Sequence, residues 1–180
     1  MKIFDTHAHY DDDSYDADKA RLLSEMEDKG VKHIINCGST LRGMRQSYQL
    51  AQDYPFVHAA LGIHPSNGHE WNDAVEEELR RLLANDKVVA VGEIGLDYHY
   101  DFSPKEVQRE WFARQIALAR ELKLPIIIHD RESHKDILDI IKSEKGNEVG
   151  GVFHCFSGSK EMAQEVLDLG FKIGLGGAIT

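Results

Sequence analysis

The feature that most constrains the fold is an unbroken alternation of short apolar runs and amphipathic stretches. The runs are rich in Val, Ile, Leu and Ala with little polar alternation, which is typical of strands buried on both faces. The stretches between them carry apolar residues at helical spacing. We expect strands to begin near Ile3, His33, Phe56, Val88, Leu124, Gly150 and Phe171, and helices over 17–29, 40–53, 73–85, 103–123, 132–145 and 159–169.

This α/β order predicts parallel strands with helical crossovers, arranged either as a doubly wound sheet or as a TIM (β/α)8-type barrel. A doubly wound sheet normally carries a Gly-rich phosphate loop after an early strand, whereas residues 5–9 read Asp-Thr-His-Ala-His. Polar residues at several strand ends favour the barrel, because barrel active sites lie on that face. A whole barrel needs roughly 250 residues, so we expect a C-terminally incomplete barrel with about seven strands, forming one domain over residues 1–180.

Charge and composition limit the classes of partner. With 21 basic and 31 acidic residues the formal charge is −10, which argues against broad, non-specific phosphate binding. A phosphate substrate stays compatible, since bound divalent cations supply local positive charge. No apolar run approaches the ~20 residues that span a bilayer, so no membrane partner is expected. Cys37 and Cys155 show no CxxC spacing, and residues 1–5 do not resemble a signal peptide, which predicts a cytoplasmic protein.

The first apolar run ends in His7-Ala8-His9. Residues two apart on a strand point to the same face, so the two imidazoles should lie side by side. Two imidazoles without partners at the end of a buried strand are costly. The pair therefore indicates metal ligands, provided that later strands bring more ligands to the same place.

Later strand ends do carry such side chains. Glu93 stands in the apolar run 88–97, where a charged residue should be paired or metal-bound, and His129 and His154 lie at the ends of the next two runs. Each has an ordinary explanation alone, as a hydrogen-bonded core histidine or an ion pair of Glu93 with Arg131. Together with the first pair they place four His and one Glu on one barrel face, a set that suits Zn²⁺, Mn²⁺, Fe²⁺ or Co²⁺ rather than Ca²⁺.

Five motifs extend this pattern along the chain and resemble those of the TatD family of metal-dependent deoxyribonucleases, a group of amidohydrolase-like TIM barrels. The motifs are Asp5-Thr6-His7-Ala8-His9, Gly62-Ile63-His64-Pro65, Gly92-Glu93-Ile94-Gly95-Leu96-Asp97, Pro125-Ile126-Ile127-Ile128-His129-Asp130-Arg131 and His154-Cys155-Phe156-Ser157-Gly158. The resemblance covers essentially all 180 residues.

The resemblance implies a site with two divalent metal ions, for which Zn, Mn, Mg, Fe and Co all remain open. One ion would be bound by His7 and His9, and the other by His129 and His154. Glu93 would bridge both ions and be essential for catalysis, and substrate phosphate would be contacted by His64 and Arg131. The family's eighth-strand Glu-Thr-Asp motif, which supplies a further Asp ligand, does not occur before Thr180.

Several residues keep an alternative role. Arg131 could instead form a salt bridge with Glu132 or Asp97. His64 could have a purely structural role, in which it holds the turn after the third strand. Tyr98 and His99 could stack on a base or belong to a plain surface loop. Because Cys155 alternates with His154, we expect the thiol to face the helical layer.

The implied function is a divalent-metal-dependent deoxyribonuclease that hydrolyses DNA phosphodiester bonds through a metal-activated water, from the 3′ end as in the family. A related amidohydrolase acting on an amide or ester is the second hypothesis. Since the last Asp ligand is absent from the sequence, a non-catalytic metal-binding fragment is the third. No oligomeric state is predicted.

Overall fold

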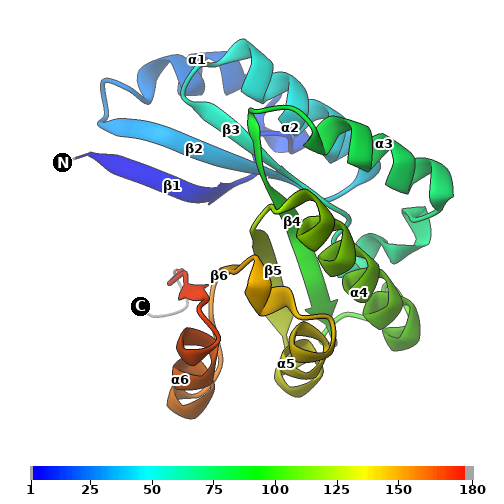
Figure 1. The fold of residues 1–180 in the computed structure, drawn as a ribbon. Helices are drawn as coiled ribbons and strands as arrows, with labels where there is room; N and C mark the ends of the chain where they lie inside the picture. Colours follow the sequence, from blue (N-terminus) through cyan, green and yellow to red (C-terminus); the bar gives the residue numbers. More distant parts are fainter. Residues whose placement is uncertain (1, 177–180) are drawn as a thin grey trace.

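Seven parallel strands form one curled sheet in which every strand pairs with its neighbours in sequence (Figure 1). The computed structural model describes residues 2–176. The strands are β1 Ile3–Ala8, β2 Val31–Gly38, β3 Val57–Leu61, β4 Val88–Asp97, β5 Ile126–Arg131, β6 Gly151–Phe153 and β7 Lys172–Ile173. A doubly wound sheet reverses its strand order at a switch point, and the sequential order here therefore confirms the barrel-type prediction.

The helices lie along the outside of this sheet (Figure 1). The α-helices are α1 Lys19–Glu25, α2 Leu41–Asp53, α3 Asp73–Leu83, α4 Lys105–Leu122, α5 His134–Ser143 and α6 Lys160–Asp168, and short 3₁₀ helices cover η1 Asp13–Tyr15, η2 Pro65–Glu70 and η3 Gly146–Glu148. All the α-helices fall within the predicted ranges. None of the described helices is both long and apolar enough to cross a membrane, and the cytoplasmic location stays a prediction.

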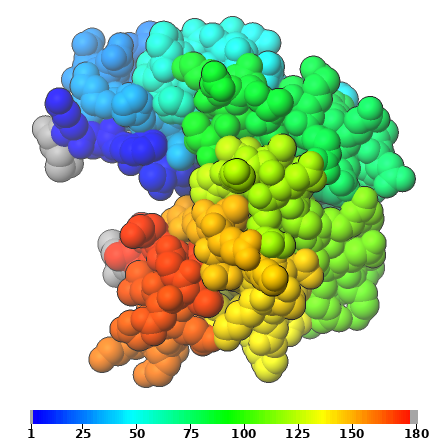
Figure 2. Space-filling view, viewed as in Figure 1, coloured from blue at the N-terminus to red at the C-terminus, as the bar shows by residue number. Residues whose placement is uncertain are grey.

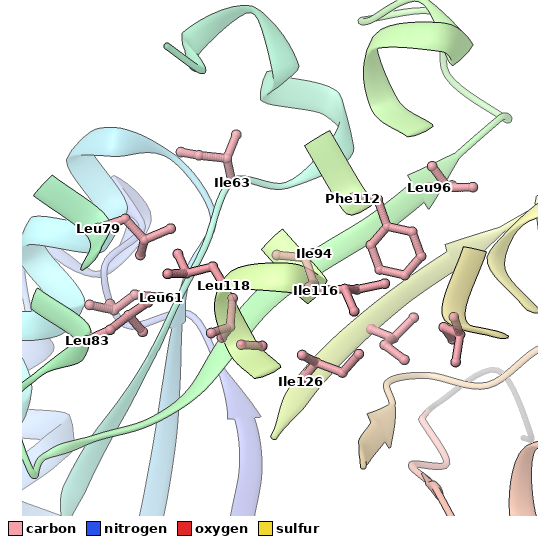
Figure 3. Close-up of a cluster of buried hydrophobic side chains, with 14 of the residues drawn as sticks. Leu61, Ile63, Leu79, Leu83, Ile94, Leu96, Phe112, Ile116, Leu118 and Ile126 are labelled. Carbon is pink, nitrogen blue, oxygen red and sulfur yellow. The ribbon is translucent and has the colours of Figure 1, made fainter. Parts of the chain in front are cut away.

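The main core lies between the outer face of the sheet and the helices (Figure 3). Leu61, Ile94 and Ile126 on the strands are fully buried, as are Phe112 and Ile116 on α4. Full burial of one such side chain contributes roughly 1.5–3 kcal/mol. This packing fixes the helices against the sheet and so fixes the positions of the strand ends.

The inner face of the sheet is open at one side, between β1 and β7, which are its edges within the described residues. The space-filling view shows a hollow there, between the N-terminal strands and the C-terminal segment (Figure 2). A cavity of about 530 Å³ lies at the amino ends of the strands, with Phe4, Ile35, Ala90 and Val152 in its lining. The histidine-rich strand ends lie at the opposite end of the sheet.

Candidate metal centre

The carboxyl ends of β1 and β4 bring the first predicted ligands together. His7 lies on β1 and His9 follows the last residue of that strand, and their Nε2 atoms are 2.9 Å apart. The Oε2 atom of Glu93, on β4, lies 3.3 Å from Nε2 of His7 and 3.5 Å from Nε2 of His9. Two imidazole nitrogens and one carboxylate oxygen therefore face a common point.

The other oxygen of Glu93 faces a second set of imidazoles. Oε1 lies 3.1 Å from Nδ1 of His129 on β5, and His64, Glu93 and His129 offer ligand atoms within 4.8 Å of one another. His64 is the N-cap residue that directly precedes η2, and its Nδ1 accepts a hydrogen bond from the backbone N–H of Ser66 at 3.2 Å. Its Nε2 is therefore the nitrogen that could bind a metal ion. His64 can thus cap the turn with one nitrogen and face the site with the other.

His154 lies directly after β6, and its ring stacks on that of His7 with centroids 3.4 Å apart. The family resemblance implied that His154 and His129 bind the same ion. In the structure the residues that offer ligand atoms close to one another at this place are His64, Glu93 and His129. His154 nevertheless shares a cavity of about 360 Å³ with His129 and Arg131. All five predicted ligands thus surround the same region, and their division between ions stays a prediction.

Arg131 lies at the end of β5 and lines this cavity. Its guanidinium group is 4.9 Å from the centre of the Tyr100 ring. The two carboxylates proposed as its salt-bridge partners are engaged elsewhere, because Glu132 contacts His99 at 2.7 Å and Asp97 contacts His129 at 3.0 Å. The guanidinium is therefore available to an anion in the cavity.

The strand alternation on which the expectation for Cys155 rested does not extend to this residue. Cys155 lines the same cavity as His154. Strand alternation does not apply there, since β6 ends at Phe153 and Cys155 has a φ of 45°.

Burial and hydrogen bonding set the charges at the centre. Glu93 is 4 % exposed, and although burial alone would raise the pKa of its carboxyl, hydrogen bonds from His129, His7 and His9 hold that pKa well below its usual value. The hydrogen bond to Glu93 raises the pKa of His9. Burial lowers the pKa of both His64 and His154 to about 4, which leaves these imidazoles neutral at pH 7 with a free lone pair.

This donor set fits divalent cations. Neutral imidazoles and one anionic carboxylate are the ligands of Zn²⁺ and of similar transition metals. The two oxygens of Glu93 face different groups of imidazole nitrogens, an arrangement suited to two ions bridged by one carboxylate. The predicted residues therefore offer a donor set that fits divalent cations.

Sequence reasoning missed the groups that orient these ligands. Asp97, which is 3 % exposed, accepts from Nε2 of His129, and the backbone carbonyl of Cys37 accepts from Nδ1 of His9 at 2.9 Å. Such contacts fix the tautomer and the ring orientation of ligating histidines. The sequence does contain a pattern that indicates Asp97, because this residue stands four residues after Glu93 and so on the same strand face. No sequence pattern indicates a role for a backbone carbonyl such as that of Cys37.

The chain is similar in sequence to known proteins. A family model described as TatD related DNase matches residues 4–180. The chain is 40% identical over 178 residues to YabD of Bacillus subtilis, described as an uncharacterized metal-dependent hydrolase, covering 99% of this chain and 70% of that protein. It is 34% identical over 175 residues to the 3'-5' ssDNA/RNA exonuclease TatD of Klebsiella pneumoniae, covering 97% of this chain and 66% of that protein.

A solved structure has the same fold. The TatD homologue YJJV of Escherichia coli superposes with a TM-score of 0.91 at 36% identity, covering 99% of this chain and 69% of that one. The strand order, the imidazoles around a buried glutamate and these matches lead to one conclusion: the chain belongs to the TatD family of metal-dependent hydrolases.

Proposed function

We propose that the protein hydrolyses phosphodiester bonds of single-stranded DNA with the help of two divalent cations. The observation that carries this proposal is the position of Glu93, whose two carboxylate oxygens face two different groups of imidazole nitrogens. Paired ions suit phosphodiester cleavage, because they can stabilise both the attacking and the leaving oxygen. The relative from Klebsiella is named a 3'-5' ssDNA/RNA exonuclease, which supports single-stranded nucleic acid as the substrate class and cleavage from the 3′ end.

His7, His9 and Oε2 of Glu93 would hold one cation. Oε1 of Glu93 and His129 would contribute to the other, with His64 within ligand distance and His154 bordering the same cavity. Bound divalent cations supply Lewis-acid polarisation of the phosphoryl group and a more acidic water.

The chain's own side chains have distinct tasks around these ions. Asp97 accepts the Nε2 proton of His129 and so leaves the lone pair of Nδ1 to bind a cation at the centre. Arg131 is placed to hold a substrate phosphate in its planar fork of N–H donors. Glu93 supplies the buried negative charge that favours cations at this place.

The test is hydrolysis of a labelled single-stranded oligonucleotide with Mn²⁺ or Mg²⁺ added. Substitution Glu93→Ala removes the shared ligand, and we expect the rate to fall by at least about 100-fold. The matched control is Glu161→Ala, which removes an exposed carboxylate on α6 and should retain the wild-type rate.

Two outcomes would contradict the proposal. Hydrolysis of an amide or ester substrate without DNA cleavage would favour a related amidohydrolase. Metal binding without turnover of any substrate would favour a non-catalytic metal-binding protein.

A further inference from the structure

The loop between β4 and α4 presents two aromatic rings to solvent. Phe102 is 65 % exposed and Tyr100 is 45 % exposed. The two rings stack on each other, with centroids 5.2 Å apart and planes 22° from parallel. The pair forms an exposed aromatic surface, and such surfaces are characteristic of binding sites.

This loop is held in place by buried groups. The backbone N–H groups of His99 and Tyr100 both donate to Oδ1 of Asp97 at 3.0 Å. Gln108 on α4, which is 2 % exposed, donates to the carbonyl of Ser103 at 2.9 Å. The backbone on both sides of the rings is therefore held in place before any ligand binds, which lowers the entropic cost of binding.

Arg131 connects this aromatic pair to the candidate metal centre. Its guanidinium group lies over the Tyr100 ring, and the same side chain lines the cavity that contains His129 and His154. A strand with one phosphate held by Arg131 could place a base against the exposed ring of Phe102. The chemistry that fits this neighbourhood is a phosphate followed by a flat aromatic group.

The surrounding charge indicates how such a ligand would be held. Asp101 and Glu132 are exposed in the same region, and the chain as a whole carries a formal charge of −10. Attraction to phosphate is therefore limited to a few groups such as Arg131. Stacking on an aromatic face is independent of charge and accepts any base, as in proteins that bind single strands without sequence preference.

We propose that Phe102, whose ring packs on that of Tyr100, forms a stacking site for an unpaired base of a single-stranded nucleic acid, a phosphate of which contacts Arg131. This inference rests on the proposed function for its substrate class. It adds a binding site outside the metal centre and explains why the aromatic pair is exposed.

A binding experiment tests the site without requiring turnover. The variant Phe102→Trp places an indole at the exposed position, and the probe is a thymidine tetranucleotide with phosphorothioate linkages. We expect the added emission to be quenched by this probe and not by an abasic counterpart with the same phosphates. Equal responses to the two probes, or no response to either, would overturn the proposal.

A second experiment uses Phe102→Ala, with Phe4→Ala as the matched control. Phe4 is also exposed, at 56 %, but it lies at the opposite end of the strands. Loss of one stacked base weakens binding by roughly 5- to 100-fold. We expect Phe102→Ala to raise KM for the oligonucleotide by that factor with kcat changed less than about 2-fold.

The two proposals fail in different ways. If the wild-type protein hydrolyses no oligonucleotide, the nuclease proposal is lost, while quenching in Phe102→Trp still decides the stacking site. If hydrolysis is normal and Phe102→Ala has the same KM as Phe4→Ala, the stacking site is lost and the nuclease proposal stands.

Discussion

The side chain of Asp97 contacts both a histidine of the candidate metal centre and the loop that follows β4. One carboxylate oxygen accepts from the backbone N–H groups of His99 and Tyr100, and the other lies 3.0 Å from Nε2 of His129. Burial alone would raise the pKa of this carboxyl, but the hydrogen bonds that it accepts from Tyr100 and His129 lower it. Asp97 therefore stays ionised and acts as a positioning residue for His129.

We expect Asp97→Asn to weaken divalent-metal binding by roughly 10- to 100-fold, the usual effect of losing an outer partner of a ligating histidine. The asparagine oxygen can still accept from the loop, but the amide N–H₂ opposes the Nε2 proton of His129 and favours the wrong tautomer. Titration calorimetry with Zn²⁺ measures the change. Asp139→Asn, at an exposed position on α5, is the control, and equal affinities in the two variants would contradict this role.

Local periodicity explains which site residues could be predicted. His7, His9, Glu93 and His129 lie on or directly beside strands, where the alternation of faces fixes the direction of a side chain. The place of His64 depends on the turn at η2, and His154 follows the end of a three-residue strand. The path of the chain beyond a strand depends on tertiary packing, so the sequence indicated both residues as part of the site but not which of them offers a ligand atom beside His129.

At the scale of elements, α4 holds the ends of two strands through buried glutamines. Gln115 accepts from the backbone N–H of Ile63 at 2.8 Å and donates to the carbonyl of the same residue at 3.1 Å. Gln108, seven residues earlier and so on the same helix face, makes the equivalent pair of bonds with Asp97. Each glutamine thus fixes the backbone directly beside a residue of the centre.

We expect Gln115→Leu to lower the free energy of unfolding by about 1–3 kcal/mol for each of the two backbone groups of Ile63 left without a partner. Urea denaturation measures the change. The matched control is Gln49→Leu on the exposed face of α2, where we expect a change within about 0.5 kcal/mol. Equal stability of the two variants would show that water replaces the side chain.

The helices and strands were predicted almost completely because their apolar spacing is strong, whereas these glutamines were not recognised. A polar residue on an amphipathic helix is normally interpreted as part of its exposed face. Gln108 and Gln115 are instead 2 % and 1 % exposed. The need for a polar side chain at these two positions becomes clear only from the hydrogen bonds that the glutamines form with the backbone of Ile63 and Asp97.

At the scale of the whole molecule, the curled sheet gathers donors that are far apart in the sequence. The two ligand groups draw on β1, β4, β5 and the turn after β3. Metal binding therefore requires most of the sheet to be folded, and it should stabilise the molecule as a unit. This convergence was predictable because the strands are parallel and in sequential order, so that their carboxyl ends all lie at the same end of the barrel-type sheet.

We expect saturating Zn²⁺ to raise Tm by roughly 5–10 °C over protein treated with EDTA. A cation at 100 times its Kd adds about 2.7 kcal/mol, and each kcal/mol moves Tm by roughly 2–4 °C in a chain of this size. Scanning calorimetry measures the shift.

Two variants show whether this stabilisation arises at the candidate centre. Glu93→Gln should remove most of the metal-dependent shift, because it removes the shared anionic ligand. His69→Ala, which alters an exposed histidine outside both ligand groups, should keep it. A full shift in Glu93→Gln would place the stabilising cation elsewhere.

The two sets of contacts made by Asp97 would couple metal binding to binding at the loop that carries Tyr100. One carboxylate holds both a histidine of the metal centre and the loop that carries Tyr100. Coupling between two binding events is reciprocal, so a cation that tightens nucleic-acid binding by some factor must itself be held tighter by the same factor once the strand is bound. If the proposed strand binding is coupled to metal binding through Asp97, a bound strand would raise the affinity of the centre for the metal.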